Sequence, residues 1–440
     1  MVYIKNLIYL CSEEGLPIRA HLMGFIECGI LPSYAIIWKK NNSGSLIRSK
    51  LKRMFPKMAI WYKNMVDINR KNSKTDVEYS EQIFGRNIFN KSSSPINLLN
   101  EANIPHKIVY ANNINDQSII NELNNINCEY VIVAKAGGIL RENIFSTKKK
   151  FINAHKGYLP DFKGSSPTHW SILSSGHYGS TIHFIDKGID TGSIIKRRKF
   201  DYPKLNSLNQ IKVYEAHIVS EVLSDVLADI HKNGKISGRN QDNNSEKAYY
   251  KPHPLLIDIS LSAQLGQEIN NNMVELEILI EKIQDIKKYR KINLVPGNKL
   301  IETLESELNA NNFENNLAQE IYGHFLYLNS NGKESEENIQ KFLVGLQKQV
   351  DLGWRRKTGI RKTSSVLSLN KISLLLLTYL YNRMYETVKD IRLLNSSCKL
   401  YDNLRFLDFM MLSDVETTCL YVVTKDLFTS LENIKSELLS

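Results

Sequence analysis

An asparagine and a histidine, Asn153 and His155, stand two positions apart at the end of an apolar run that is typical of a β-strand. Side chains at i and i+2 of a strand point to the same side, so an amide and an imidazole would converge on one point. Such a pair can hold a carbonyl oxygen and stabilise the negative charge that develops on it. Asp190 lies in the glycine-flanked segment GIDTG, which can form a loop that brings a carboxylate close. These residue types suit chemistry at a carbonyl carbon.

Alternating strand and helix signals surround these residues and predict an α/β fold with an open, mostly parallel, Rossmann-like sheet. Ligands bind beyond the carboxyl ends of the strands in such sheets, which is where Asn153 and His155 would stand. The expected strands are 4–11, 34–38, 107–110, 130–134, 151–154 and 181–185, and the expected helices are 16–28, 95–102, 116–124, 142–145, 167–174 and 207–232.

The pattern changes beyond residue 257, where apolar residues recur at helical spacing and predict an all-α C-terminal domain. The periodic stretches are 273–286, 300–308, 339–346, 372–388 and 427–439, with one possible strand at 419–423. We therefore expect a catalytic domain over 1–232, interrupted by a basic insertion at 40–92, a linker over 233–257 and an α-helical domain of unknown role over 258–440.

The composition of the 440-residue chain agrees with two globular domains, since 42% of its residues are hydrophobic. The formal net charge of +11 suits an anionic partner, although scattered surface lysines would give the same value. Five widely spaced cysteines without a CxxC pair predict neither disulfides nor a zinc site and suit a reducing cytosol. The N-terminus is interpreted as a β-strand, and the later apolar run 372–381 is too short to span a bilayer. The expected location is cytoplasmic, with no membrane partner.

The segment from Phe151 to Gly192 combines several motifs at fixed spacing. Asn-x-His is followed by Leu159-Pro160, then by Thr-x-His-Phe over 181–184, and finally by Asp-x-Gly-x-Asp-x-Gly over 186–192. This combination resembles the folate-dependent formyltransferase family. The resemblance is strongest over 130–195, fits the element order from residue 1 to about 232, and does not extend to the helical half.

The resemblance implies that Asn153, His155 and Asp190 are the catalytic residues and that His183 is the histidine of the family's Thr-x-His strand. It also implies 10-formyltetrahydrofolate as co-substrate and no metal. The implied folate-binding residues form two loops: Gly138, Ile139 and Leu140 in one, and Ile185, Asp186, Gly188 and Ile189 in the other.

The implied reaction transfers a formyl group from the folate to a primary amine of a small metabolite. A nucleotide-linked amino sugar is the preferred acceptor, because Gly157 occurs in sugar-type members and AYYKPHP over 248–254 resembles a segment that closes their domains. Amino acid or peptide amines, hydrolysis of formyltetrahydrofolate, and a non-catalytic scaffold remain alternatives. Nucleic acid is not expected as a partner, since a tRNA-binding member should carry a β-barrel where this chain has helices. The helical half could form a homodimer, select the acceptor or have a separate activity.

Overall fold

The structure is a computed structural model. It describes residues 1–41, 72–134, 138–241, 248–266, 273–292, 302, 316–330, 336–356, 366, 369–404, 407 and 411–439. Two compact units appear in it, the first formed by residues 1–171 and 176–248 and the second by residues 172–175 and 249–440. The finer division into a catalytic domain over 1–232, a linker over 233–257 and a helical domain over 258–440 stays a prediction.

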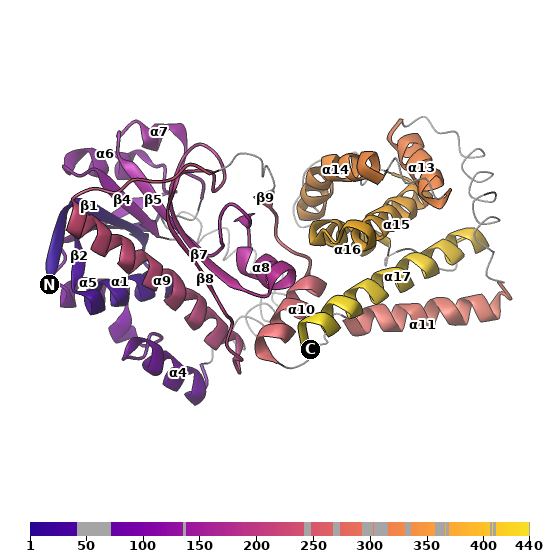
Figure 1. Ribbon diagram of the computed structural model, residues 1–440, viewed down its shortest axis with the longest axis horizontal. Coiled ribbons are helices and arrows are strands. Elements are labelled where there is room, and N and C mark those ends of the chain that lie inside the picture. Colours follow the sequence, from indigo (N-terminus) through magenta and orange to yellow (C-terminus); the bar gives the residue numbers. More distant parts are fainter. Residues whose placement is uncertain are drawn as a thin grey trace. The chain divides into compact units, whose positions relative to one another are not determined.

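The first unit is built on a seven-stranded sheet with the order β3-β2-β1-β4-β5-β7-β8 (Figure 1). Its strands are β1 (Val2–Ser12), β2 (Ile30–Lys40), β3 (His106–Ala111), β4 (Tyr130–Ala134), β5 (Lys150–His155), β7 (Tyr178–Phe184) and β8 (Ile194–Phe200). The five strands from β3 to β5 are parallel, whereas β7 pairs antiparallel with β5 and β8 pairs antiparallel with β7. The predicted open, mostly parallel α/β sheet is therefore confirmed.

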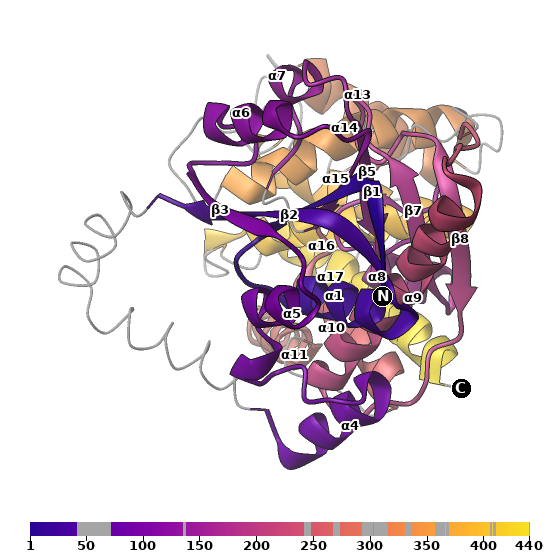
Figure 2. The same ribbon diagram turned by 90° about the vertical axis from the view of Figure 1, so that its left-hand side faces the viewer.

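Helices cover both faces of this sheet, which makes three layers (Figure 2). Alternate residues of β1 enter different cores: Leu7 and Tyr9 pack in one, Ile8 and Leu10 in the other. This is the period of two that a strand buried on both faces requires. The first core is closed by α1 (Leu16–Cys28), α5 (Pro95–Glu101) and α9 (Leu208–Asn233), and the second by α6 (Gln117–Asn125) and α7 (Glu142–Phe145).

The remaining elements up to residue 249 are α4 (Lys74–Phe84), the short 3-10 helix η2 (Lys91–Ser93), β6 (Lys163–Gly164), α8 (Pro167–Ser175) and β9 (Ala248–Tyr249); the ends of α8 and β9 fall in the second unit. Helix α4 begins at Ser73, whose side chain accepts from the backbone N–H of Asp76 while Asp76 accepts from Ser73 N. Residues 42–71 of the predicted insertion lie outside the described residues, whereas its later part contains α4. Strand β8 was not predicted, because IIKRRKF contains too few apolar residues to give a strand signal.

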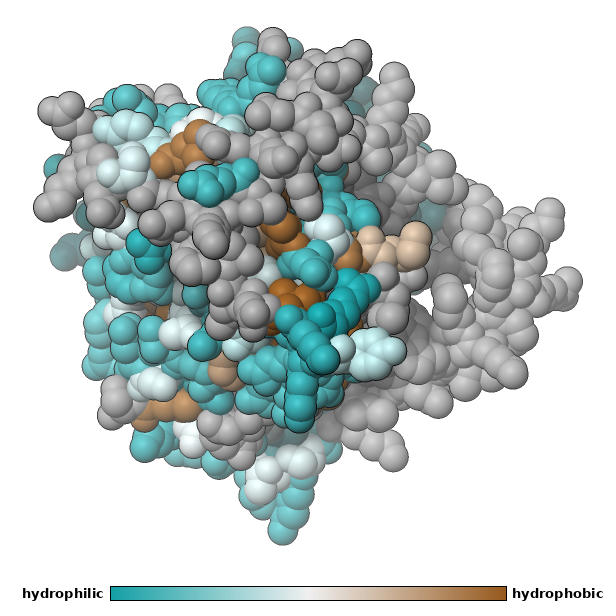
Figure 3. Space-filling view, turned by 90° about the vertical axis from the view of Figure 1, so that its right-hand side faces the viewer, coloured by the Kyte–Doolittle hydropathy of each residue, from teal (hydrophilic) through white to brown (hydrophobic). Residues whose placement is uncertain are grey.

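From Pro254 onward, the regular elements of the second unit among its described residues are helices. Its helices are α10 (Pro254–Leu265), α11 (Met273–Tyr289), α13 (Asn316–Asn329), α14 (Glu336–Arg356), α15 (Lys371–Val388), α16 (Ile391–Leu404) and α17 (Asp414–Leu439). The all-α prediction is confirmed, but the possible strand at 419–423 is wrong, because these residues lie inside α17. The predicted helix at 300–308 lies outside the described residues apart from Glu302. In Figure 3 the described surface is mainly hydrophilic, with hydrophobic side chains in small separate patches.

A buried ion pair lies in the core of the helical unit. Lys399 of α16 binds Asp351 of α14, and both side chains are only 1% exposed. One helical turn further along the same two helices, Trp354 Nε1 donates to Asp402 Oδ2 over 2.7 Å. The Lys399 ammonium also lies 5.4 Å from the centre of the Trp354 ring. These two polar contacts fix the register of α14 against α16.

Among the described residues, no helix combines the length and the apolar character needed to cross a membrane.

Candidate active site

The pairing of β5 with β7 creates the centre of the site. Asn153 of β5 stands directly opposite His183 of β7 in the antiparallel register. Their side chains meet, with Asn153 Nδ2 at 3.1 Å from His183 Nε2. His155 lies two residues further along β5, on the same side of the strand, as the sequence predicts.

The protonation of His183 determines how the amide of Asn153 is oriented. Burial and the neighbouring His155 lower the pKa of His183 to about 4, so this ring is neutral at pH 7. Its Nδ1 lies 2.8 Å from the carbonyl oxygen of Phe184, which can only accept, so Nδ1 carries the ring's single proton. Nε2 must then accept from Asn153 Nδ2. The amide of Asn153 keeps a second N–H, which can donate to a substrate carbonyl.

His155 is held between a backbone carbonyl and a carboxylate. Its Nε2 lies 2.8 Å from the carbonyl oxygen of Phe162, so Nε2 carries a proton and donates it there. Its Nδ1 lies 3.5 Å from Asp190 Oδ2. The ring is only 6% exposed. Nδ1 is consequently the ring atom that faces Asp190.

Asp190 brings its carboxylate between the two imidazoles. Oδ2 faces His155 and accepts from the backbone N–H of Gly164 over 2.9 Å, while Oδ1 lies 3.6 Å from His183 Nε2. The backbone of Asp190 has φ of 55°, a left-handed conformation that a loop must enforce. Gln241 provides one constraint, since its Nε2 donates to the carbonyl oxygens of Asp190 and Gly192 over 2.9 and 2.7 Å.

Gly192 ends this loop where no side chain could fit. A Cβ there would meet the carbonyl oxygen of Phe184 at 1.8 Å. Since the same carbonyl accepts from His183 Nδ1, a larger residue would displace the strand that orients the site. The glycine that the sequence places after Asp190 is therefore a packing requirement.

The two loops predicted to bind folate lie against a common core. Leu140 is buried and Ile185 packs partly buried against the same cluster. Each loop also exposes an isoleucine: Ile139 is 67% exposed and Ile189 is 51% exposed. Exposed apolar side chains of this size can cover the face of a flat ring. Residues 135–137, next to Gly138, lie outside the described part of the chain.

Hydrogen bonds stiffen both loops. Asp186 Oδ1 accepts from Gly188 N over 3.0 Å and from Thr191 Oγ1 over 2.6 Å, which folds the second loop on itself. Asn115 Nδ2 donates to the carbonyl oxygen of Ile139 over 2.9 Å and anchors the first loop. Asp186 thus supports the loop through its side-chain carboxylate.

The structure brings together Asn153, His155 and Asp190, which are separated by 37 positions in sequence at most. Sequence reasoning missed two groups: the carbonyl of Phe162, which holds His155, and the side chain of Gln241, which holds the Asp190 loop. A backbone carbonyl has no residue signature, and Gln241 stands in a polar stretch whose composition predicts only a loop. Among the residues that the structure describes, no group of three or more His, Cys, Asp or Glu side chains could hold a metal ion.

Substitution of Gly157 by alanine is expected to disturb His155. The new Cβ would lie 2.8 Å from His155 Nε2, 2.8 Å from Pro167 Cβ and 2.9 Å from the carbonyl oxygen of Phe162. Such overpacking costs about 1–3 kcal/mol. We expect a lower free energy of unfolding in urea together with a lower turnover. Gly323→Ala is the control, because a Cβ at this position of α13 would meet no described atom within 4 Å beyond the backbone of its own helix. Unchanged stability and turnover in Gly157→Ala would contradict the predicted crowding.

Acidification should destabilise the first unit through His183. The pKa of His183 in the folded chain, about 4, lies below the ordinary value of 6.5. Between pH 4 and pH 6.5 the unfolded chain therefore binds more protons than the folded chain. Stability is fully present above pH 6.5 and falls as the pH drops towards 4, by roughly 3 kcal/mol for this group. Urea unfolding at pH 7 and pH 4.5 measures the loss. A His183→Gln variant, which keeps an acceptor for Asn153, should lose less stability over the same range; an equal loss would show that another group titrates.

The chain matches known proteins over this unit. The family model described as formyl transferase matches residues 72–227. Methionyl-tRNA formyltransferase of Rickettsia bellii is 32% identical over 145 residues, which cover 32% of this chain and 47% of that protein. The enzyme of the same name from Finegoldia magna is 25% identical over 198 residues, covering 43% of this chain and 62% of that protein. The chain thus spans about half the length of the curated relatives that it matches.

Two solved structures are also similar. The formyltransferase PseJ from Anoxybacillus kamchatkensis, in complex with UDP-4,6-dideoxy-4-formamido-L-AltNAc and tetrahydrofolate, is 30% identical with a TM-score of 0.27, covering 33% of this chain and 74% of that one. Phosphoribosylglycinamide formyltransferase from Streptococcus pneumoniae is 12% identical with a TM-score of 0.34, covering 52% of this chain and 99% of that one.

The matched domain is that of enzymes that transfer a formyl group. Through this domain the chain belongs to the folate-dependent formyltransferase family, so the resemblance seen in the sequence is confirmed.

Proposed function

We propose that the chain transfers a formyl group from 10-formyltetrahydrofolate to the primary amine of a small metabolite, with Asn153, His155 and Asp190 as catalytic residues. The observation that carries this proposal is the position of the Asp190 carboxylate, whose two oxygens lie 3.5 Å from His155 and 3.6 Å from His183. The Asn153 amide is fixed beside them through His183. The site thus places a carbonyl-oxygen donor, an imidazole and a carboxylate side by side.

The folate supplies the formyl carbon when it is bound. As the acceptor amine attacks this carbon, a C–N bond forms and the formyl oxygen gains negative charge. The second N–H of Asn153 donates to this oxygen, and the imidazole of His155 adds positive potential when Nδ1 is protonated. The Asp190 carboxylate, 3.5 Å from Nδ1, takes the proton that the amine loses, directly or through a water molecule. The bond from the formyl carbon to the folate nitrogen then breaks, and that nitrogen regains a proton.

The folate would bind against the loops 138–140 and 185–189. The exposed side chains of Ile139 and Ile189 support this assignment, since they can cover the faces of a pteridine ring. The backbone of 185–189 adds polar groups at the same place, and Asp186 holds that backbone in shape. These features fit a flat, partly polar ligand.

A nucleotide-linked amino sugar is the acceptor that we favour. Gly157 supports this choice, because a glycine at this position occurs in sugar-type members of the family. The all-helical character of the described second unit also differs from the β-barrel expected of a tRNA-binding enzyme. Methionyl-tRNA is the second candidate, because curated relatives with 32% and 25% identity are named methionyl-tRNA formyltransferases.

A release assay tests the reaction and the acceptor together. The full chain is incubated with 10-formyltetrahydrofolate and one acceptor at a time: a UDP-linked amino sugar, an amino acid, a peptide or methionyl-tRNA. Tetrahydrofolate release that requires the amino sugar, with the formamide detected by mass spectrometry, is the expected result. Release that requires methionyl-tRNA would identify methionyl-tRNA as the acceptor in place of the amino sugar. Release without any acceptor would indicate a hydrolase. No release from a sample that binds folate would overturn the enzymatic proposal.

A further inference from the structure

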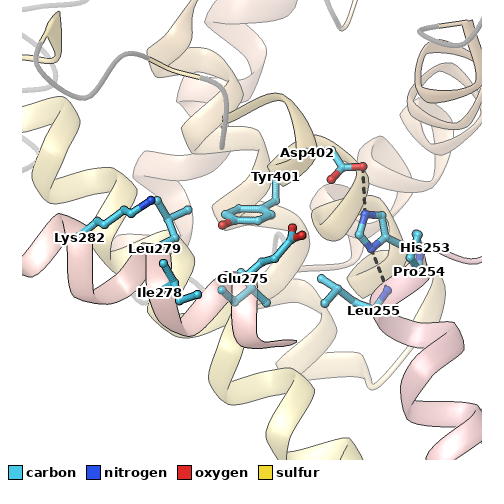
Figure 4. A pocket seen from close by; sticks show the side chains of 10 residues that line it. His253, Pro254, Leu255, Glu275, Ile278, Leu279, Lys282, Tyr401 and Asp402 are labelled. Atoms are coloured by element: carbon cyan, nitrogen blue, oxygen red, sulfur yellow. Dashed lines mark hydrogen bonds and ion pairs between the residues drawn. The ribbon is translucent and has the colours of Figure 1, made fainter. Parts of the chain in front are cut away.

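A cavity lies within the helical unit, and none of its lining residues belongs to the candidate active site. Its volume is about 290 Å³, and it lies between the start of α10, one face of α11 and the end of α16 (Figure 4). Charged groups on its walls are Glu275 and Lys282 of α11 and Asp402 of α16, while Leu279 and the ring of Tyr401 are apolar surfaces. The cavity is at the small end of the range of ligand sites.

The α11 wall separates two opposite charges. Glu275, Ile278, Leu279 and Lys282 follow the spacing i, i+3, i+4 and i+7, so they form one face of the helix. Glu275 and Lys282 are two turns apart, a rise of about 10 Å along the axis. Figure 4 shows Glu275 on the side of Asp402 and Lys282 on the opposite side, with Tyr401 between them. A ligand lying along this face would therefore meet carboxylates at one end and an ammonium at the other.

The carboxylate of Asp402 accepts a hydrogen bond from Trp354 and lies close to the ring of His253. Trp354 Nε1 donates to Oδ2 over 2.7 Å. His253 Nδ1 accepts from the backbone N–H of Leu255 over 3.3 Å, which leaves Nε2 to face Asp402. That Nε2 lies 3.1 Å from Asp402 Oδ2 without forming a hydrogen bond. The Trp354 donor and the nearby His253 ring thus fix the position of the Asp402 carboxylate at the cavity wall.

The buried pair Lys399–Asp351 supports this arrangement from behind. Lys399 and Asp402 are one turn apart on α16, and Asp351 and Trp354 are one turn apart on α14. The ion pair fixes α14 against α16, and the hydrogen bond from Trp354 of α14 then holds Asp402 of α16 in place. A carboxylate supported in this way keeps its geometry in the absence of a ligand.

We propose that this cavity binds a small zwitterion, a molecule with an ammonium group at one end and a carboxylate or phosphate at the other. The ammonium lies between Glu275 and Asp402 against the ring of Tyr401, a combination of ionic and cation–π attraction. The anionic group lies at Lys282, and the aliphatic part covers Leu279. The site belongs to the helical unit alone and is independent of formyl transfer.

Calorimetric titration of the full chain with three compounds of matched length tests the proposal: 6-aminohexanoate, hexanoate and hexylamine. We expect 6-aminohexanoate to bind at least about tenfold more tightly than the two singly charged compounds, because each of them loses one of the two ionic contacts. The series glycine, 4-aminobutyrate and 8-aminooctanoate then measures the charge separation that the site prefers.

Variants at each end locate the binding. Glu275→Gln and Lys282→Gln should each weaken the binding of 6-aminohexanoate by about tenfold. Each should also reduce the preference for 6-aminohexanoate over one of the singly charged compounds. Glu277→Gln is the matched control, since this exposed glutamate of α11 is not among the residues lining the cavity. Circular dichroism verifies that all three variants fold. Equal binding of the three compounds, binding that both variants leave unchanged, or no binding by any ω-amino acid would overturn the proposal. Because binding is measured directly, these results do not depend on the proposed formyl transfer.

Discussion

Replacing Asn153 with alanine is expected to lower kcat for formyl transfer by about 10²- to 10³-fold, the usual effect of removing one oxyanion donor. The amide N–H that donates to the formyl oxygen acts mainly in the transition state, when that oxygen carries charge. KM for the folate should therefore change little. Steady-state kinetics with the best acceptor from the release assay measures both constants.

Two further variants make this result specific. Asn153→Asp should lower kcat by a similar factor, because a carboxylate cannot donate a hydrogen bond and repels the negative charge that develops on the formyl oxygen. Asn121→Ala is the control, since this exposed asparagine of α6 contacts only Gln117 in the described hydrogen bonds. If Asn153→Ala keeps its kcat, the amide has no role in the chemical step.

Substitution of Lys399 by methionine is expected to cost about 3–5 kcal/mol of stability, because it leaves the Asp351 carboxylate buried without its ammonium. Both side chains are 1% exposed, so water cannot replace the lost partner. Chemical denaturation followed by the helical circular dichroism signal measures the loss. The helical unit should unfold at a clearly lower denaturant concentration.

The double variant Lys399→Met with Asp351→Leu should recover most of this stability, because it removes the charge together with its partner. Lys341→Met serves as the surface control: its pair with Glu337 is 69% and 75% exposed, and it should change stability by less than about 1 kcal/mol. A single variant as stable as the wild type would mean that Asp351 is protonated or hydrated in the folded chain.

The elements that position the site could be predicted because local signals were strong. The strand ending in Asn153 and His155 is apolar up to those residues, and the helix from Leu208 to Asn233 has a serine N-cap and a glycine C-cap. The convergence of Asp190 on His155 came from motif spacing, and the structure brings the two side chains together.

Other features could not be predicted from residue types. The orientation of Asn153 depends on which nitrogen of His183 carries a proton, and this follows from a backbone carbonyl at Phe184 that only the fold supplies. Strand β8 has almost no apolar alternation, so its pairing with β7 comes from the sheet and not from its own pattern. The cavity beside Glu275 and Asp402 requires two helices that are distant in sequence to pack together.

The basic character of β8 has a consequence for how the protein behaves at high concentration. This strand ends the sheet, and an outermost strand offers unpaired backbone groups to which another copy could add. Four consecutive cations, Lys196 to Lys199, repel an identical strand. Carboxylates of α9, such as Asp225 and Glu221, neutralise part of this charge within one molecule. High salt should screen the remaining repulsion and promote self-association through the edge strand β8.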